Sequence, residues 1–278
     1  MIDANTISSK LLSYSKKHNV NHQMILIRFF HERLLYRVSI SEFCDQLMLK
    51  GGSLLFAIHG NTARPTADID FLGSKISNNT EEIINVFRKI IDINTNDSIL
   101  FDTNSITAIE INEQNQYAGV RVKVMAMLGN IKQNLQIDIG FGDVINPSPV
   151  SLHNPILLQE FEAPIILAYT NETVIAEKLH AIIVLAQLNS RMKDFYDIYT
   201  LLNSQKINSE NLKQAIEQTF SNRNTTINFE TIVFTPEFYN DASRNRMWNA
   251  FLLKINADYF RFETVVISIE RFVKDIFK

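Results

Sequence analysis

Residues 47–71, LMLKGGSLLFAIHGNTARPTADIDF, decide the fold of this chain. A short apolar run at residues 47–49 meets two glycines and a serine at residues 51–53, and a second apolar run follows as far as Gly60. This order predicts a strand, a turn and a helix that ends at Gly60. Residues 67–72 then alternate polar and apolar side chains with a period of two, which predicts a strand with one solvated face.

Alternating segments continue downstream of this stretch. Residues 105–111, 119–124 and 135–139 each alternate and are separated by polar turns, which predicts an antiparallel meander. A proline-containing break at residues 146–149 ends the pattern. Beyond a short strand predicted at residues 165–169, the sequence to its end is typical of helices.

Helices are predicted on both sides of these strands. Apolar residues at helical spacing indicate two amphipathic helices before residue 40, one at residues 80–93 and one at residues 173–188. We therefore expect an α/β (α+β) protein with a small mixed sheet. Its first lobe comprises residues 1–160, and its mainly helical carboxy-terminal lobe comprises residues 161–278.

Composition excludes several classes of protein. The chain has 278 residues, of which 46% are hydrophobic and 21% are charged, so it is globular and not disordered or fibrous. A net charge of −3 excludes coating of nucleic acid through bulk positive charge but leaves a local basic groove open. The single cysteine excludes an intramolecular disulfide framework. With no leader pattern and no apolar run long enough to span a membrane, we expect a cytoplasmic protein without a membrane partner.

Three aspartates form a candidate metal site. Asp68 and Asp70 point to the same face of a predicted strand, so both carboxylates can bind one hard cation. Asp138 lies between Ile137 and Ile139 on a later strand, and an adjacent position in the sheet would bring it beside the pair. Such clustered like charges are tolerated mainly when a divalent cation neutralises them. An Asp-x-Asp pair by itself is more often a solvated strand edge.

The glycine-serine turn is a candidate phosphate site. Gly51 and Gly52 let backbone N–H groups turn inward at a helix start, where the positive end of the helix dipole suits a triphosphate. Ser53 can add a hydroxyl donor, and Arg64 can neutralise phosphate through its planar guanidinium. By itself, a Gly-Gly-Ser turn is usually an ordinary connector. The glycine-serine turn and the Asp68/Asp70 pair are separated by one predicted helix, and this combination favours a functional site.

A second candidate group lies on two later helices. Lys178 can project from an apolar helix towards a cleft and bind a phosphate. Arg191, Asp194 and Asp197 follow at spacings of three on the next helix. The alternative is a ladder of ion pairs on a solvated helix surface, each pair contributing about 0.3–0.5 kcal/mol. We expect stability changes near ±0.5 kcal/mol when Lys178 or Asp194 is replaced, as for surface residues.

Other polar residues are weaker candidates. Arg121 and Lys123 share one strand face and are candidate contacts for a polyanion, although solvated strand charges are the commoner explanation. His59 and His180 each lack a second histidine at metal-ligand spacing, so we assign them no role.

The chain resembles the AbiEii family of nucleotidyltransferase toxins, which includes the MenT toxins, within the superfamily that has a polymerase-beta-like core. The resemblance spans residues 45–205 and is carried by four segments in order: residues 49–55 (LKGGSLL), 64–71 (RPTADIDF), 176–179 (AEKL) and 190–198 (SRMKDFYDI). The glycine turn and acidic pair alone would indicate only the superfamily.

The resemblance implies a toxin of a toxin–antitoxin or phage-defence system, with a cognate antitoxin as partner. It implies transfer of a nucleotide from a nucleoside triphosphate to RNA, with the tRNA 3′ end as the leading acceptor and Mg²⁺ or Mn²⁺ as cofactor. In such toxins the residues matching Lys178 and Asp194 are needed for activity. We expect the helical carboxy-terminal lobe of this chain to close a cleft over the nucleotide. Two alternatives stay open: transfer to a protein or small molecule by the same core, and a catalytically silent nucleotide-binding module.

Overall fold

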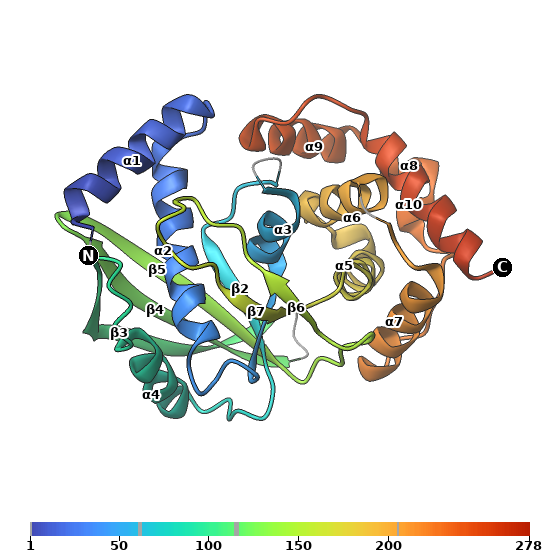
Figure 1. The fold of residues 1–278 in the computed structure, drawn as a ribbon. Coiled ribbons are helices and arrows are strands. Elements are labelled where there is room, and N and C mark those ends of the chain that lie inside the picture. The colour runs from blue at the N-terminus through green and yellow to red at the C-terminus, as the bar shows by residue number, and fades with distance from the viewer. Residues whose placement is uncertain (1, 61–62, 114–116, 205) are drawn as a thin grey trace. The chain divides into compact units, whose positions relative to one another are not determined.

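A computed structural model of the chain describes residues 2–60, 63–113, 117–204 and 206–278 (Figure 1). It divides into two compact units, Met1–Gly142 with Val150–Ala168, and Asp143–Pro149 with Tyr169–Lys278. The backbone therefore passes between the units three times, after residues 142, 149 and 168.

The first unit contains a mixed sheet, for which the described residues supply seven strands in the order β3-β4-β5-β2-β1-β7-β6. β4 pairs antiparallel with both β3 and β5, whereas β2 pairs parallel with β5, and β1 pairs parallel with β7. The expected mixed sheet and its antiparallel meander are confirmed. The strands are β1 (Leu47–Lys50), β2 (Asp68–Gly73), β3 (Ile99–Glu113), β4 (Tyr117–Leu128), β5 (Ile131–Phe141), β6 (Val150–His153) and β7 (Ile165–Ala168).

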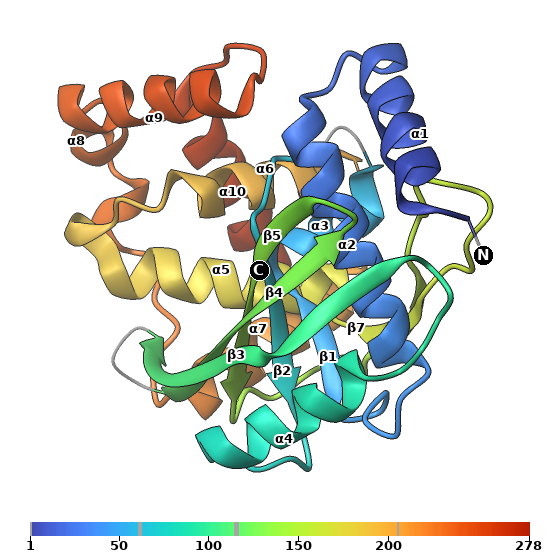
Figure 2. The same cartoon turned by 90° about the vertical axis from the view of Figure 1, so that its left-hand side faces the viewer.

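Helices of the first unit cover this sheet. They are α1 (Ala4–Lys17), α2 (His22–Ser39), α3 (Gly51–His59) and α4 (Thr80–Ile91). α2 packs on β5 and β7, α4 packs on β3 and β4, and the two helices contact each other, so they lie on one face of the sheet (Figures 1 and 2). The fully buried side chains Phe29, Ile69, Phe87 and Ile137 belong to this apolar layer, and their burial is the main force that holds the strands of the site in place.

The second unit is mainly helical, as expected. Its helices are α5 (Asn171–Leu185), the 3₁₀ turn η2 (Ala186–Leu188), α6 (Met192–Ser204), α7 (Ser209–Asn222), the 3₁₀ turn η3 (Ile232–Phe234), α8 (Pro236–Tyr239), α9 (Ala242–Ile255) and α10 (Phe262–Ile276). α5 packs against α6 and α7, and α10 packs against α6 and α7. In its core the ring of Phe262 lies 5.0 Å from that of Phe195 and 5.4 Å from that of Trp248, measured between centroids. None of the helices in the described ranges is long and apolar enough to cross a membrane.

Several element bounds differ from the sequence-based expectation. β3, β4 and β5 extend beyond the alternating runs, because pairing along a long antiparallel arm tolerates the polar residues at their ends. β6 was not expected: it has four residues and directly follows the proline-containing break. The helix predicted to reach residue 188 stops as an α-helix at Leu185, where Ala186 takes a φ of 42° and a 3₁₀ turn follows.

Candidate functional site

The structure brings the three candidate metal-binding aspartates together. β2 and β5 are parallel neighbours, and their register sets Asp70 beside Asp138. Asp68 shares a strand face with Asp70, since side chains two residues apart point the same way. One carboxylate oxygen from each of the three residues lies within 4.8 Å of the other two.

This arrangement fits a hard divalent cation. Three carboxylate oxygens at one point suit Mg²⁺ or Mn²⁺, and Mg²⁺ usually keeps part of its water shell in protein sites of this kind. Asp138 is buried, whereas Asp68 and Asp70 are half-buried. Clustering three acids costs electrostatic energy, so some positive charge has to compensate.

Part of that compensation comes from Arg121, which sequence reasoning treated as a weak candidate contact for a polyanion. Its Nε donates to Asp138 Oδ1 at 2.8 Å and its Nη2 donates to Asp138 Oδ2 at 2.7 Å. Gln136 Nε2 donates to the same Oδ2 at 3.3 Å. Arg121 lies opposite Asp138 in the β4–β5 pairing, while its neighbour Lys123 lies opposite Gln136 and stays exposed.

The glycine turn lies directly against the acidic group. Gly51 has a φ of 65°, and a Cβ built there would overlap the carboxylate of Asp70. The Gly52 N–H points at Asp70 Oδ2 across 3.4 Å. These two glycines therefore allow the first turn of α3 to approach the acidic strand more closely than any other residue type would permit.

Ser53 and Thr66 fasten the turn to the strand. The Ser53 hydroxyl donates to the backbone oxygen of Asp68 at 3.0 Å, and the Thr66 hydroxyl donates to Asp68 Oδ1 at 2.5 Å. The Ser53 hydroxyl thus binds the backbone of β2, and its contact with a phosphate remains a prediction.

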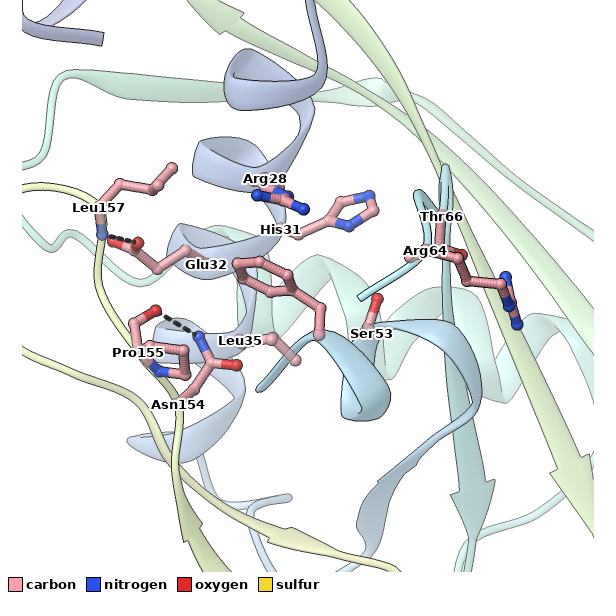
Figure 3. Close-up of a pocket in the computed structure, with 11 residues that line it drawn as sticks. Arg28, His31, Glu32, Leu35, Ser53, Arg64, Thr66, Asn154, Pro155 and Leu157 are labelled. Atoms are coloured by element: carbon pink, nitrogen blue, oxygen red, sulfur yellow. Dashed lines mark hydrogen bonds between the residues drawn. The ribbon is translucent and has the colours of Figure 1, made fainter. Parts of the chain in front are cut away.

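A pocket adjoins this corner within the first unit. Arg64, Ser53 and Thr66 line one side of it, and Glu32 and Leu157 line the opposite side (Figure 3). Its buried His31 has a pKa lowered to about 4 by desolvation, which the nearby Asp68 and a backbone hydrogen bond with Ala67 only partly oppose. The imidazole is therefore neutral at physiological pH. Arg64 is near the turn, as expected.

The second candidate group forms a buried ion-pair cluster within the helical unit. Lys178 Nζ lies 3.1 Å from Asp194 Oδ1 and 2.8 Å from Asp197 Oδ2. Arg191 Nε lies 2.6 Å from Asp194 Oδ2. The exposed fraction is 0% for the side chain of Asp194 and 2% for Asp197. The alternative of a solvated surface ladder is wrong, because both acids are buried and pair with Lys178 of α5, which packs against α6.

Burial also corrects the expected energetics. Lys178 has an exposed side-chain fraction of only 11%. Removing one partner of a buried pair leaves an uncompensated charge and costs far more than a surface substitution. The expected change of about ±0.5 kcal/mol for Lys178 or Asp194 therefore does not apply. The acidic site belongs to one compact unit and this cluster to the other, so a shared nucleotide cleft stays a prediction.

A third polar cluster, which sequence reasoning did not find, ties the segment after β5 to the helical unit. Arg223 Nη2 donates to Asp143 Oδ1 at 2.8 Å and lies 3.7 Å from Glu177 Oε1. Arg223 also contacts His180, whose other ring nitrogen lies 3.0 Å from the Thr225 hydroxyl. Burial, with Arg223 nearby, lowers the pKa of His180 to about 4. His180 therefore has a structural place here.

Comparisons with known proteins agree with this fold. A family model described as "Nucleotidyl transferase AbiEii toxin, Type IV TA system" matches residues 33–266. No curated protein matches the sequence. Among solved structures, JHP933 from Helicobacter pylori is similar with a TM-score of 0.52 and 13% identity, covering 92% of each chain. A second H. pylori structure, described as a candidate nucleotidyltransferase, has a TM-score of 0.48 and 13% identity, covering 92% of this chain and 96% of the other.

Proposed function

Since the chain belongs to the AbiEii family of nucleotidyl transferase toxins, we propose that it transfers a nucleotide from a nucleoside triphosphate to an RNA acceptor, with the tRNA 3′ end first among the candidates. Family membership makes it a nucleotidyltransferase toxin of a toxin–antitoxin system. We further propose that it acts in the cytoplasm, that it serves in phage defence and that a cognate antitoxin protein controls it. One observation carries the catalytic proposal: three carboxylates converge beside a glycine-lined helix start.

Asp68, Asp70 and Asp138 are the residues that would hold Mg²⁺ or Mn²⁺. When bound, such a cation neutralises phosphate oxygens and lowers the proton affinity of an attacking hydroxyl. In the reaction, an acceptor hydroxyl oxygen forms a bond to the α-phosphorus and loses its proton, while the bond between the α- and β-phosphates breaks and pyrophosphate leaves. The protein contributes mainly the orientation of the two reactants.

The start of α3 is proposed to bind the triphosphate. Gly51 and Gly52 place the first backbone N–H groups of a nine-residue helix beside the acids, and the positive end of the helix dipole favours phosphate there. Ser53 anchors this turn to the Asp68 strand and is proposed to reach phosphate once nucleotide binds. Arg64 supplies further positive charge at the same corner.

Lys178, Arg191, Asp194 and Asp197 are proposed to complete the nucleotide site from the helical unit. Their support is the match to the family's later segments and the burial of the two acids around one lysine. Two carboxylates on either side of a lysine fix the orientation of its ammonium group, which suits a phosphate contact. Asp194 is proposed to act in catalysis through the orientation of Lys178 and Arg191.

The test is transfer of label to RNA. Wild-type protein is incubated with total RNA, Mg²⁺ and each of the four α-³²P-labelled nucleoside triphosphates in turn, and the products are separated by size. We expect label on RNA of tRNA length with the wild type and with Glu110→Gln, which removes an exposed carboxylate from the same sheet. Asp70→Asn should keep its fold by circular dichroism and lose the label.

Three results would contradict the proposal. Undiminished transfer by Asp70→Asn would refute the metal assignment. Label found on protein or on a small molecule would support the alternative acceptor class. A wild-type protein that binds nucleotide and Mg²⁺ but transfers nothing to RNA, protein or metabolite would indicate a catalytically silent module.

A further inference from the structure

Arg121 forms an ion pair with Asp138, one of the three proposed metal ligands. Its guanidinium takes both oxygens of Asp138 in a two-bond fork, at 2.8 and 2.7 Å. Both oxygens of Asp138 therefore already have a cationic partner within the protein. The side chain of Asp138 is 7% exposed, so water contributes little to its solvation and the fork supplies most of the compensation.

The Arg121 guanidinium and a divalent cation would both bind the carboxylate of Asp138. A metal shared with Asp68 and Asp70 needs an oxygen of Asp138, because the three carboxylates converge within 4.8 Å. With the fork in place, a +1 group would lie in contact with a ligand of a +2 ion, and the two cations repel each other. The side chain of Arg121 is 33% exposed, so its guanidinium borders water as well as Asp138.

We propose that Arg121 is the internal counter-ion of the acidic group: it pairs with Asp138 when no metal is bound and competes with the divalent cation for that carboxylate. This inference rests on the proposed function only in that the three aspartates bind a cation. Its consequence is a weakened affinity for free metal, so that the site fills mainly when a triphosphate arrives with its own cation. Arg121 is a positioning residue in this scheme, since it acts through Asp138.

A purely structural role for Arg121 predicts the opposite sign. If the fork only held Asp138 in the correct orientation for a metal, its removal would disorder a ligand and weaken metal binding. If the fork competes, its removal frees a ligand and strengthens metal binding. The direction of the change in affinity separates the two roles, independently of catalysis.

The experiment is calorimetric titration of nucleotide-free protein with Mn²⁺. We expect Arg121→Gln to bind Mn²⁺ at least about tenfold more tightly than the wild type, because one competing charge is gone. Arg121→Lys, which keeps the charge but loses the fork, should lie between them. Lys123→Gln is the matched control: it removes an exposed positive charge two residues away on the same strand, and it should bind Mn²⁺ within about twofold of the wild type.

Thermal unfolding gives a second readout. Without metal, Arg121→Gln should melt at a lower temperature than the wild type, because the buried carboxylate has lost its partner. Saturating Mn²⁺ should raise its melting temperature by more than it raises that of the wild type. If Arg121→Gln does not fold without metal, the Mn²⁺ affinity of Arg121→Lys, compared with that of the wild type, tests the proposal instead.

Equal or weaker Mn²⁺ binding by Arg121→Gln or Arg121→Lys would overturn this inference. The outcomes also separate it from the proposed function. A protein that transfers nucleotide to RNA, but whose Arg121 variants bind Mn²⁺ no more tightly, refutes the counter-ion alone. A protein whose Mn²⁺ affinity responds to Arg121 as expected, but which transfers no nucleotide, refutes the activity and leaves the counter-ion intact.

Discussion

At the scale of single residues, the approach of Gly51 to Asp70 is the tightest constraint on the acidic site. Gly51→Ala should lose transferase activity, because the added methyl group occupies the place of the Asp70 carboxylate. A non-glycine residue in this left-handed conformation also costs about 1–2 kcal/mol of stability. Activity and the free energy of unfolding in urea are the measurements.

Gly60→Ala is the matched control for that prediction. Gly60 also has a positive φ, of 60°, so a side chain there is strained as well, but a Cβ there meets no described atom within 4 Å. Both variants should lose stability, whereas only Gly51→Ala should lose activity. Equal activities in the two variants would show that Asp70 does not need its present position.

The buried cluster around Lys178 should behave as a core feature. Lys178→Met leaves Asp194 and Asp197 buried without their shared cation, and we expect it to destabilise the protein by about 3–5 kcal/mol. The control is Lys274→Met, which removes a surface pair with Glu270 at 2.9 Å and should change stability little. Chemical denaturation measures both, and a Lys178→Met loss as small as the control's would contradict the burial argument.

The buried His180 makes stability depend on pH. Its pKa falls to about 4 in the folded protein, from about 6.5 in the unfolded chain. The unfolded state therefore binds more protons between these values, and the contribution to stability is present above about pH 6.5 and is lost as the pH falls towards 4. The slope of the free energy of unfolding from this residue reaches at most about 1.4 kcal/mol per pH unit.

Urea denaturation between pH 7.5 and pH 4.5 measures this effect. His180→Gln should show a shallower loss of stability on acidification than the wild type, while the exposed His153→Gln should follow the wild type. His31, whose pKa is also lowered to about 4, is present in all three proteins and does not affect the comparison. Parallel curves for His180→Gln and the wild type would contradict the assignment.

The acids of the site could be predicted from the sequence because alternation alone fixes their common face. The alternation of polar and apolar residues was enough to predict a common face for Asp68 and Asp70, and the apolar neighbours of Asp138 were enough to predict its orientation. The pairing of Arg121 with Asp138 was missed, because it depends on the register between two strands. The two-residue turn at Gly129 and Asn130, which sets Leu128 opposite Ile131 and hence Arg121 opposite Asp138, was the signal that could have found it.

At the scale of elements, local sequence patterns predicted where helices and strands lie but not which strands pair. The strand and helix at residues 47–59 are bounded by glycines, and the structure has them where the sequence placed them. The parallel pairing of β2 with β5 joins segments about seventy residues apart, and no local pattern encodes it. The Lys178 cluster shows the same limit: spacing revealed its ladder on α6, but the packing of α5 that buries it is a tertiary fact.

At the scale of the whole molecule, the path of the chain decides which fragments can fold. A fragment comprising residues 161–278 would carry β7 without β1 and β6, the strands that pair with it. It would also lack Asp143, the partner of Arg223. We expect this fragment to show no cooperative thermal transition by circular dichroism, unlike the full chain. A sharp transition would show that the helical half folds on its own from residue 161.

The three passages of the backbone between the units also bear on how such a protein can change over generations. A gene that exchanges its helical half with a relative's through one crossover would replace residues 169–278 but keep the old segment 143–149, which belongs to the same unit. The new helices would then need a residue that donates a hydrogen bond to the retained Asp143, as Arg223 does here. A donor half with a cation at this place would keep the pair, whereas a donor without one would leave Asp143 without its Arg223 partner.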